Sequence, residues 1–279
     1  MRTAQRILEN TSGSLIDQTL LLNDYRQDTV TLEYNTGEYI YVASEWPFNS
    51  KYIDVSTAND QAATLQVQIY DGNSWTNASD ILDDTAVNGA SLARSGYVYF
   101  VPDRNSSWAI KDYSNEITEL SSTDIRSMYW VRFSFSADLN AATALNYLGH
   151  KFCETTEIYS MYPDLDSTKL LRTFGGVSKT DWDEQIFIAS DAVLRDLKRK
   201  GVIFANNQVL EVDIFRDACI HKVAEIIYSS LGKPYIEQRK NAAKDYESAA
   251  DLENYRFDAD ADGQADRAEK FTHVARMHR

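Results

Sequence analysis

The spacing of apolar residues changes once along the chain, near Ala141, and this change limits most strongly what the chain can fold into. Between residues 29 and 136, apolar and polar residues alternate in short runs rich in β-branched and aromatic side chains, as in β-strands. Turn sequences such as Asn35-Thr36-Gly37 separate these runs. Many short strands at this spacing predict an antiparallel β-sandwich over residues 1–145. The runs are residues 31–34, 38–42, 51–55, 63–70, 97–101 and 129–135.

Beyond Ala141 the period lengthens toward 3.6 and predicts three helices. The first begins near Thr180, which can cap it, and ends at Gly201. The second covers residues 212–231 and is apolar around most of its circumference, which indicates a buried central helix. The third covers residues 235–252 and is rich in charge, with these residues expected to face inward: Ile236, Ala243, Tyr246 and Ala250.

The resulting expectation is an α+β protein of two domains. Residues 1–145 form the β-sandwich and residues 178–279 form a helical bundle. Residues 146–177 are expected to be an irregular linker, because Pro163 and the pair Gly175-Gly176 interrupt the helical period there.

The charge balance argues against a protein that grips nucleic acid. The formal net charge is -14, and residues 1–150 hold 9 Lys and Arg against 19 Asp and Glu. Binding to a phosphate backbone depends on Lys and Arg that release counterions. DNA is therefore not expected as a directly bound partner.

Cysteine usage and hydropathy indicate a protein that folds in a reducing compartment and does not enter a membrane. Cys153 and Cys219 are far apart in sequence, so we expect two buried thiols and no disulfide framework. No run of 7–15 apolar residues follows Met1, so we expect no signal peptide. No run of about 18 apolar residues occurs either, so we expect no membrane span.

Residues 258–269 match the twelve-residue calcium loop of an EF-hand. Carboxylates stand at loop positions 1, 3, 5, 9 and 12, and Gly263 stands at position 6, where the loop turns sharply. Position 8 is Ala265, where paired loops carry a branched apolar residue. We therefore expect one structural Ca²⁺ and no calcium switch. The predicted ligands are Asp258, Asp260, Asp262, Gln264, Asp266 and Glu269.

Other chemistry has weaker support in the sequence. The motifs of serine hydrolases, zinc proteases, phosphate loops and dinucleotide-binding folds do not occur, so no catalytic residue is assigned and no enzyme is expected. His150 with Cys153 and Cys219 with His221 have no recognised zinc spacing. The tryptophans of the β half could line a sugar-binding platform. Trp130 is expected in the core. Trp75 and Trp108 are the better candidates for exposure, although packing is the favoured interpretation for them too.

Both halves resemble structural proteins of tailed bacteriophages. The back half, residues 181–252, looks like the helical core of head-tail connector (adaptor) proteins, with a helix, a break at Gly201, a long apolar helix, a break at Gly232 and a charged helix. The front half resembles a β-sandwich that recurs in phage structural proteins, in residues 75–132 and above all in Trp75, Asp80, Asn88, Gly89, Pro102, Trp108 and Trp130.

This resemblance implies a ring of identical subunits, twelvefold beneath the portal, in the neck of a virion assembled in the host cytoplasm. Its partners would be the portal protein, other neck and tail proteins and further copies of the chain, and DNA would pass through the channel without specific binding. Two alternatives remain open. The chain could be a carbohydrate- or receptor-binding module of a tail or baseplate, or a calcium-dependent cell-wall hydrolase.

Overall fold

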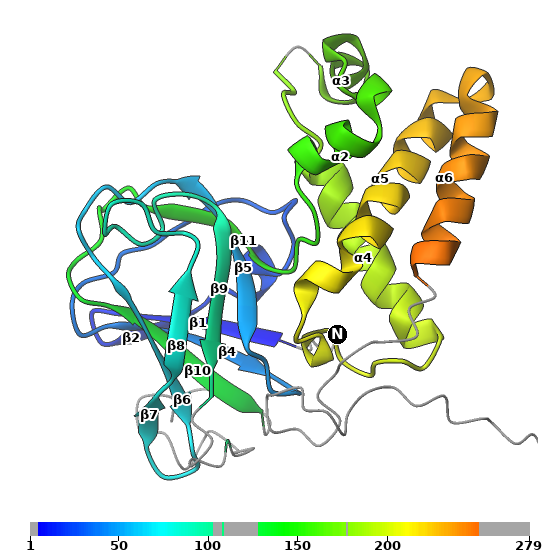
Figure 1. The fold of residues 1–279 in the computed structure, drawn as a ribbon. Helices are drawn as coiled ribbons and strands as arrows, with labels where there is room; N and C mark the ends of the chain where they lie inside the picture. The colour runs from blue at the N-terminus through cyan, green and yellow to red at the C-terminus, as the bar shows by residue number, and fades with distance from the viewer. Residues whose placement is uncertain (1–4, 103–107, 109–127, 177, 251–279) are drawn as a thin grey trace, which may run out of the picture. The chain divides into compact units, whose positions relative to one another are not determined.

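The computed structural model describes residues 5–102, 108, 128–176 and 178–250. The chain folds as two compact units. One, here called the β unit, contains residues 5–149 and also residues 205–210. The other, here called the helical unit, contains residues 150–204 and, among the described residues, 211–250. The expected α+β class is therefore confirmed, with two antiparallel sheets followed by a helical region (Figure 1).

The β unit is built from two antiparallel sheets that share one core. The six-stranded sheet has the order β2-β1-β4-β10-β6-β7, and the five-stranded sheet has the order β3-β11-β5-β9-β8. The first comprises β1 (Gln5–Thr11), β2 (Ser14–Asp17), β4 (Tyr39–Ser44), β6 (Leu65–Tyr70), β7 (Trp75–Asn77) and β10 (Tyr129–Phe135). The second comprises β3 (Val30–Thr31), β5 (Ser50–Thr57), β8 (Ser79–Asp83), β9 (Gly96–Val101) and β11 (Ala144–Gly149), and a short helix, α1 (Thr19–Leu22), follows β2.

Alternation along the strands explains how the core forms. In β6, Leu65, Val67 and Ile69 are buried in the core between the sheets, together with Ile53 and Val98 of the five-stranded sheet. Strand β4 is buried on both faces, because its second face carries a separate apolar cluster. That cluster contains Leu8, Tyr41, Ala43, Tyr70, Met128 and Trp130.

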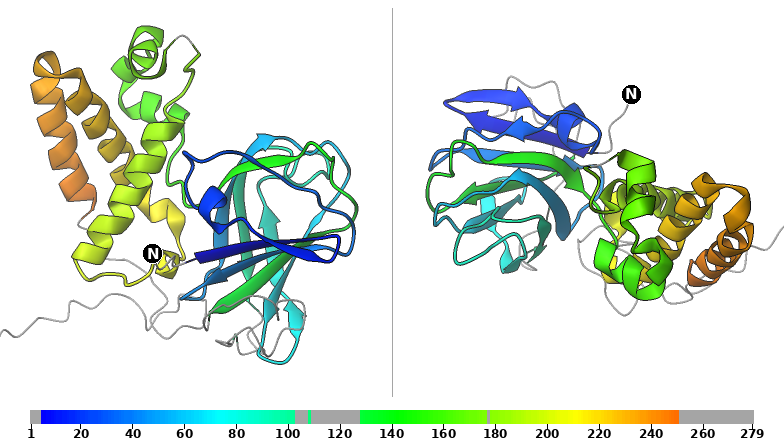
Figure 2. Two further views of the ribbon diagram at one scale, coloured as in Figure 1. Left: turned by 180° about the vertical axis from the view of Figure 1, so that it is seen from behind. Right: turned by 90° about the horizontal axis from the view of Figure 1, so that it is seen from above.

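The helical unit is organised around α5 (Arg216–Leu231), which packs against both α4 (Asp183–Arg199) and α6 (Ile236–Ala249) (Figure 2). Its buried residues lie on several sides of the helix, as the sequence predicts for a central helix. They are Ala218, Cys219, Ile220, Val223, Ala224, Ile227 and Tyr228. Tyr246 of α6 and Ala250, which follows the helix, are buried as expected. Ile236, also expected to face inward, is 41% exposed, and Ala243 is half-buried whereas its neighbour Ala242 is buried. None of the described helices is long and apolar enough to cross a membrane.

The helix ends show where sequence signals succeed and where they fail. Gly201 and Gly232 follow α4 and α5 with φ angles of 71° and 79°, so both predicted breaks are confirmed. Helix α4 begins at Asp183, close to the predicted start, but the predicted cap at Thr180 is wrong. Trp182 occupies the cap position and gives no side-chain cap. The backbone N–H of Asp183 donates instead to the Asp181 carboxylate at 3.2 Å, from the residue before the cap.

The irregular linker expected over residues 146–177 is also wrong. This region contains the end of β11, the helices α2 (Thr155–Met161) and α3 (Thr168–Gly175), and a 3₁₀ turn, η2 (Pro163–Leu165). The buried side chains of Ile158 and Leu165 anchor these short elements in the helical unit. Pro163 opens the 3₁₀ turn, because its missing N–H is not needed at the first position of a helical turn.

Candidate functional site

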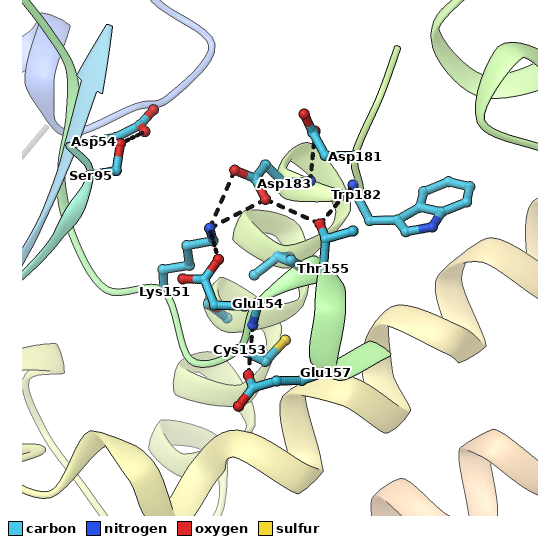
Figure 3. A network of polar contacts seen from close by, with 12 residues as sticks. Asp54, Ser95, Lys151, Cys153, Glu154, Thr155, Glu157, Asp181, Trp182 and Asp183 are labelled. Atoms are coloured by element: carbon cyan, nitrogen blue, oxygen red, sulfur yellow. Dashed lines mark hydrogen bonds and ion pairs between the residues drawn. The ribbon is translucent and has the colours of Figure 1, made fainter. Parts of the chain in front are cut away.

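A buried lysine joins the N-terminal ends of two helices in the helical unit (Figure 3). The Nζ atom of Lys151 lies 2.6 Å from the carboxylate of Glu154, which precedes α2, and 3.2 Å from that of Asp183 in the first turn of α4. The Lys151 side chain is 3% exposed. Burial raises the pKa of the Glu154 carboxyl, and the Lys151 charge opposes that rise. The ammonium bridges both carboxylates, so the cluster connects the N-terminal ends of α2 and α4.

One face of α5 carries a hydrogen-bonded set of aromatic and acidic groups. The Tyr228 hydroxyl donates to both oxygens of Asp164, at 2.8 and 2.9 Å, and the Tyr162 hydroxyl lies 2.7 Å from Nδ1 of His221. His221 and Tyr228 are seven residues apart and therefore share a helix face. Burial raises the pKa of Tyr162 to about 12 and lowers the pKa of His221. Both groups are thus neutral near pH 7 and act as hydrogen-bonding groups.

A charged surface lies along α4, α5 and α6. It contains a cleft of about 510 Å³ and a neighbouring groove of about 450 Å³ that share Glu225, Ala243 and Glu247. Inside the cleft, the Tyr246 hydroxyl donates to Asp196 at 2.7 Å, and Lys222 lies 4.5 Å from the centre of the Tyr246 ring. The charged lining residues are Asp196, Arg199, Lys200, Lys222, Glu225, Arg239, Lys240, Lys244 and Glu247, six basic and three acidic. We call this the basic surface because basic residues outnumber acidic ones in its lining, whereas the whole chain carries a net charge of -14.

A second buried lysine lies in the β unit. Lys51 of β5 is fully buried, and its Nζ lies 2.6 Å from the side-chain oxygen of Gln5 and 2.6 Å from that of Asn207. The Asn207 amide in turn donates to the Ser44 hydroxyl at 2.5 Å. Burial lowers the pKa of Lys51 to about 7. This lysine therefore holds residues 205–210 against the strands through amide groups, without a carboxylate partner among the described contacts of its Nζ.

The tryptophans of the β half differ in exposure. Trp108 is 8% exposed and packs in the core, so the favoured interpretation of packing is confirmed for it, as is the burial of Trp130. Trp75 is half-buried, and the Arg132 guanidinium lies 4.6 Å from its ring centre and 3.8 Å from that of Tyr39. The guanidinium covers one face of each ring, where a sugar could otherwise stack. This arrangement favours packing over carbohydrate recognition at Trp75.

The predicted metal and thiol residues have different outcomes. The calcium loop 258–269 lies outside the described residues. Across the part of the chain that is described, no group of three or more His, Cys, Asp and Glu side chains is arranged to hold a metal ion. Cys153 and Cys219 are both buried free thiols, as expected. Their Sγ atoms, however, are only 3.3 Å apart, which their separation of 66 residues did not indicate.

Comparisons with known proteins add little. No protein-family model and no curated protein matches the chain. Among solved structures, it has a likeness to CpGH89CBM32-6 from Clostridium perfringens, at 11% identity and a TM-score of 0.28. The likeness covers 53% of this chain and 93% of that one. A TM-score this low supports no conclusion about fold or function.

Proposed function

We propose that the chain is a subunit of a head-tail connector ring in a tailed bacteriophage. The observation that carries the proposal is the construction of the helical unit. A central apolar helix, α5, lies between α4 and the highly charged α6, and left-handed glycines at 201 and 232 mark the two breaks. This is the order of elements through which the sequence resembles the adaptor core. This order of elements supports a structural role, in which the subunit shapes a ring, and we assign no catalytic residue.

We assign the contact between neighbouring subunits to the basic surface. In a chain with 42 Asp and Glu against 28 Lys and Arg, a second copy presents mainly negative charge, so a basic surface complements it. Arg239 and Lys244 make no ion pair within the described part of the chain, so their charges are available to a partner. The ring would be twelvefold beneath the portal, and the DNA would pass through its channel without specific binding.

Electron microscopy of the virion tests this proposal. We expect the chain in a symmetric ring between head and tail, in twelve copies. A location at a fibre tip, or absence from the particle, would contradict the proposal and favour the receptor-binding alternative.

Charge reversal tests the assigned contact. In phage that carries the gene, the double substitution Arg239→Glu and Lys244→Glu should reduce the yield of joined heads and tails at least tenfold, because like charges would face each other at the contact. Lys169→Glu, on exposed α3 of the same unit, is the matched control and should leave the yield unchanged. If the control lost as much yield as the double variant, or the double variant lost none, the basic surface would not be the contact between subunits.

We also propose that Asp258, Asp260, Asp262, Asp266 and Glu269, with the Gln264 carbonyl, bind one structural Ca²⁺. The support is the spacing of the carboxylates, which repel one another strongly unless a cation joins them. Titration calorimetry should show one site with a Kd on the order of 10⁻⁵ to 10⁻³ M, since the loop has no paired partner. Glu269→Ala should weaken binding at least tenfold because it removes the bidentate ligand. Equal binding by that variant, or no heat at millimolar Ca²⁺, would contradict the site.

A further inference from the structure

Two cysteines from distant parts of the sequence meet in the core of the helical unit. Cys153 precedes α2, and Cys219 lies in the first turn of α5. The Cys153 thiol donates a hydrogen bond to the sulfur of Cys219 at a Sγ–Sγ distance of 3.3 Å. Both residues are at most 3% exposed. We propose that they are a disulfide-forming pair, which cross-links the helical unit when the chain meets a small-molecule disulfide such as glutathione disulfide.

The surroundings distinguish the two sulfurs. Cys219 accepts the hydrogen bond from Cys153, and the Ser190 hydroxyl lies 3.5 Å from the same sulfur, close enough to donate to it. Cys219 is also the fourth residue of α5, near the positive end of the helix dipole. Cys219 is thus the acceptor in the contact between the two sulfurs, although its own S–H also points to the Ile186 carbonyl at 4.0 Å, whereas Cys153 keeps its proton as the donor. Cys219 is therefore the attacking sulfur, and Cys153 is the resolving one.

The reaction needs only the two cysteines and one molecule of glutathione disulfide, which is the oxidant. The Cys219 thiolate attacks one sulfur of the small disulfide, which forms a mixed disulfide and releases one glutathione thiolate. Cys153 then attacks the Cys219 sulfur, which breaks the mixed disulfide and releases the second glutathione thiolate, and the protons lost by the two cysteines are taken up by the two released glutathiones. Two thiols of the protein are oxidised, and one small disulfide is reduced to two thiols. The two Sγ atoms must approach from 3.3 Å to about 2.05 Å, a movement that side-chain rotation and small backbone shifts can supply.

Burial sets the rate of this reaction. The pKa of Cys153 is raised by its hydrogen bond to Cys219 and by its burial, so this thiol does not react while the core is closed. Oxidation therefore proceeds through local opening of the helical unit and is slow. Once formed, the bond closes a loop of 66 residues and removes much of the freedom of the unfolded chain.

Equilibration of the full-length protein with glutathione disulfide tests the proposal. After alkylation in denaturant, we expect no alkyl group on the chain, an intact mass about 2 Da below that of the reduced, unalkylated chain, and a peptide pair joined through Cys153 and Cys219. We also expect the helical unit to melt on the order of 10 °C higher than in the reduced protein. Both thiols still alkylated, a glutathione adduct that persists at either cysteine, or a cross-link between two chains would overturn the proposal.

Three variants separate the roles within the pair. Cys153→Ser should stop at a mixed disulfide on Cys219, because the resolving thiol is absent. Cys219→Ser should react at least tenfold more slowly, because the attacking sulfur is absent. Ser190→Ala keeps both cysteines and should form the same cross-link more slowly. Equal rates of glutathione addition in the two cysteine variants would overturn the assignment of Cys219, and the peptide map of the unchanged protein decides the cross-link even if a variant does not fold.

Discussion

Trp182→Ala is expected to lower the free energy of unfolding of the helical unit by about 3–5 kcal/mol, as for other fully buried aromatic side chains. Trp182 is 0% exposed, and its ring lies edge-on to Phe174 at 5.3 Å between ring centres. Its Nε1–H donates to the Leu165 carbonyl at 3.2 Å. The substitution leaves a cavity between α3 and α4 and an unpaired carbonyl in η2. Urea unfolding followed by circular dichroism at a helix-sensitive wavelength measures the change.

Trp182→Phe is the matched control for this prediction. It keeps most of the ring and loses the Nε1–H, so a loss of about 1–2 kcal/mol is expected. If alanine and phenylalanine gave the same loss, the hydrogen bond and not the packing would hold this part of the unit. A loss below about 1 kcal/mol for alanine would show that Trp182 is not a core residue.

Lys51 should make the stability of the β unit depend on pH in a window where most other groups do not titrate. Its pKa is about 7 in the folded protein and near 10.5 in the unfolded chain. Between these values the unfolded chain binds one more proton than the folded one, so stability rises with pH. Below pH 7 both states are protonated, and the destabilisation from the buried charge is fully present. The slope should reach about 1.4 kcal/mol per pH unit.

Urea unfolding at pH 7, 8 and 9, followed by tryptophan fluorescence, measures this slope, since four of the five tryptophans precede residue 150. Lys51→Met is the control: it keeps the length of the side chain and removes the titrating group. The rise with pH should disappear in the variant, whatever its stability at pH 7. A slope that is the same in both proteins would show that Lys51 keeps an ordinary pKa.

Local patterns predicted the parts of the fold that local physics determines. Period-two alternation located β6 and β10, and the glycines at 201 and 232 located two helix ends, because left-handed backbone favours glycine wherever it occurs. The short helices α2 and α3 were missed. At seven and eight residues they are too short to be stable alone, so tertiary contacts through residues such as Ile158 decide that they form.

The contacts of the candidate site follow from tertiary structure and could not be predicted. Lys51 and Asn207 are 156 residues apart, and nothing near either residue indicates the other. The contact of the Arg132 guanidinium with two aromatic rings likewise depends on the register of four strands. Tyr39, Trp75 and Arg132 belong to β4, β7 and β10, and β6 lies between β10 and β7.

Residues 205–210 belong to the β unit although the chain on both sides of them belongs to the helical unit. During synthesis, the β unit therefore remains incomplete after Gly149 has been added. At translation rates of about 5–20 residues per second, Asn207 follows roughly 3–12 s later. Until then the Lys51 ammonium lacks one of its two amide partners, and the strands around it contain a buried donor without its final acceptor. The order of synthesis thus delays the last step of β-unit folding until much of the helical unit has also been made.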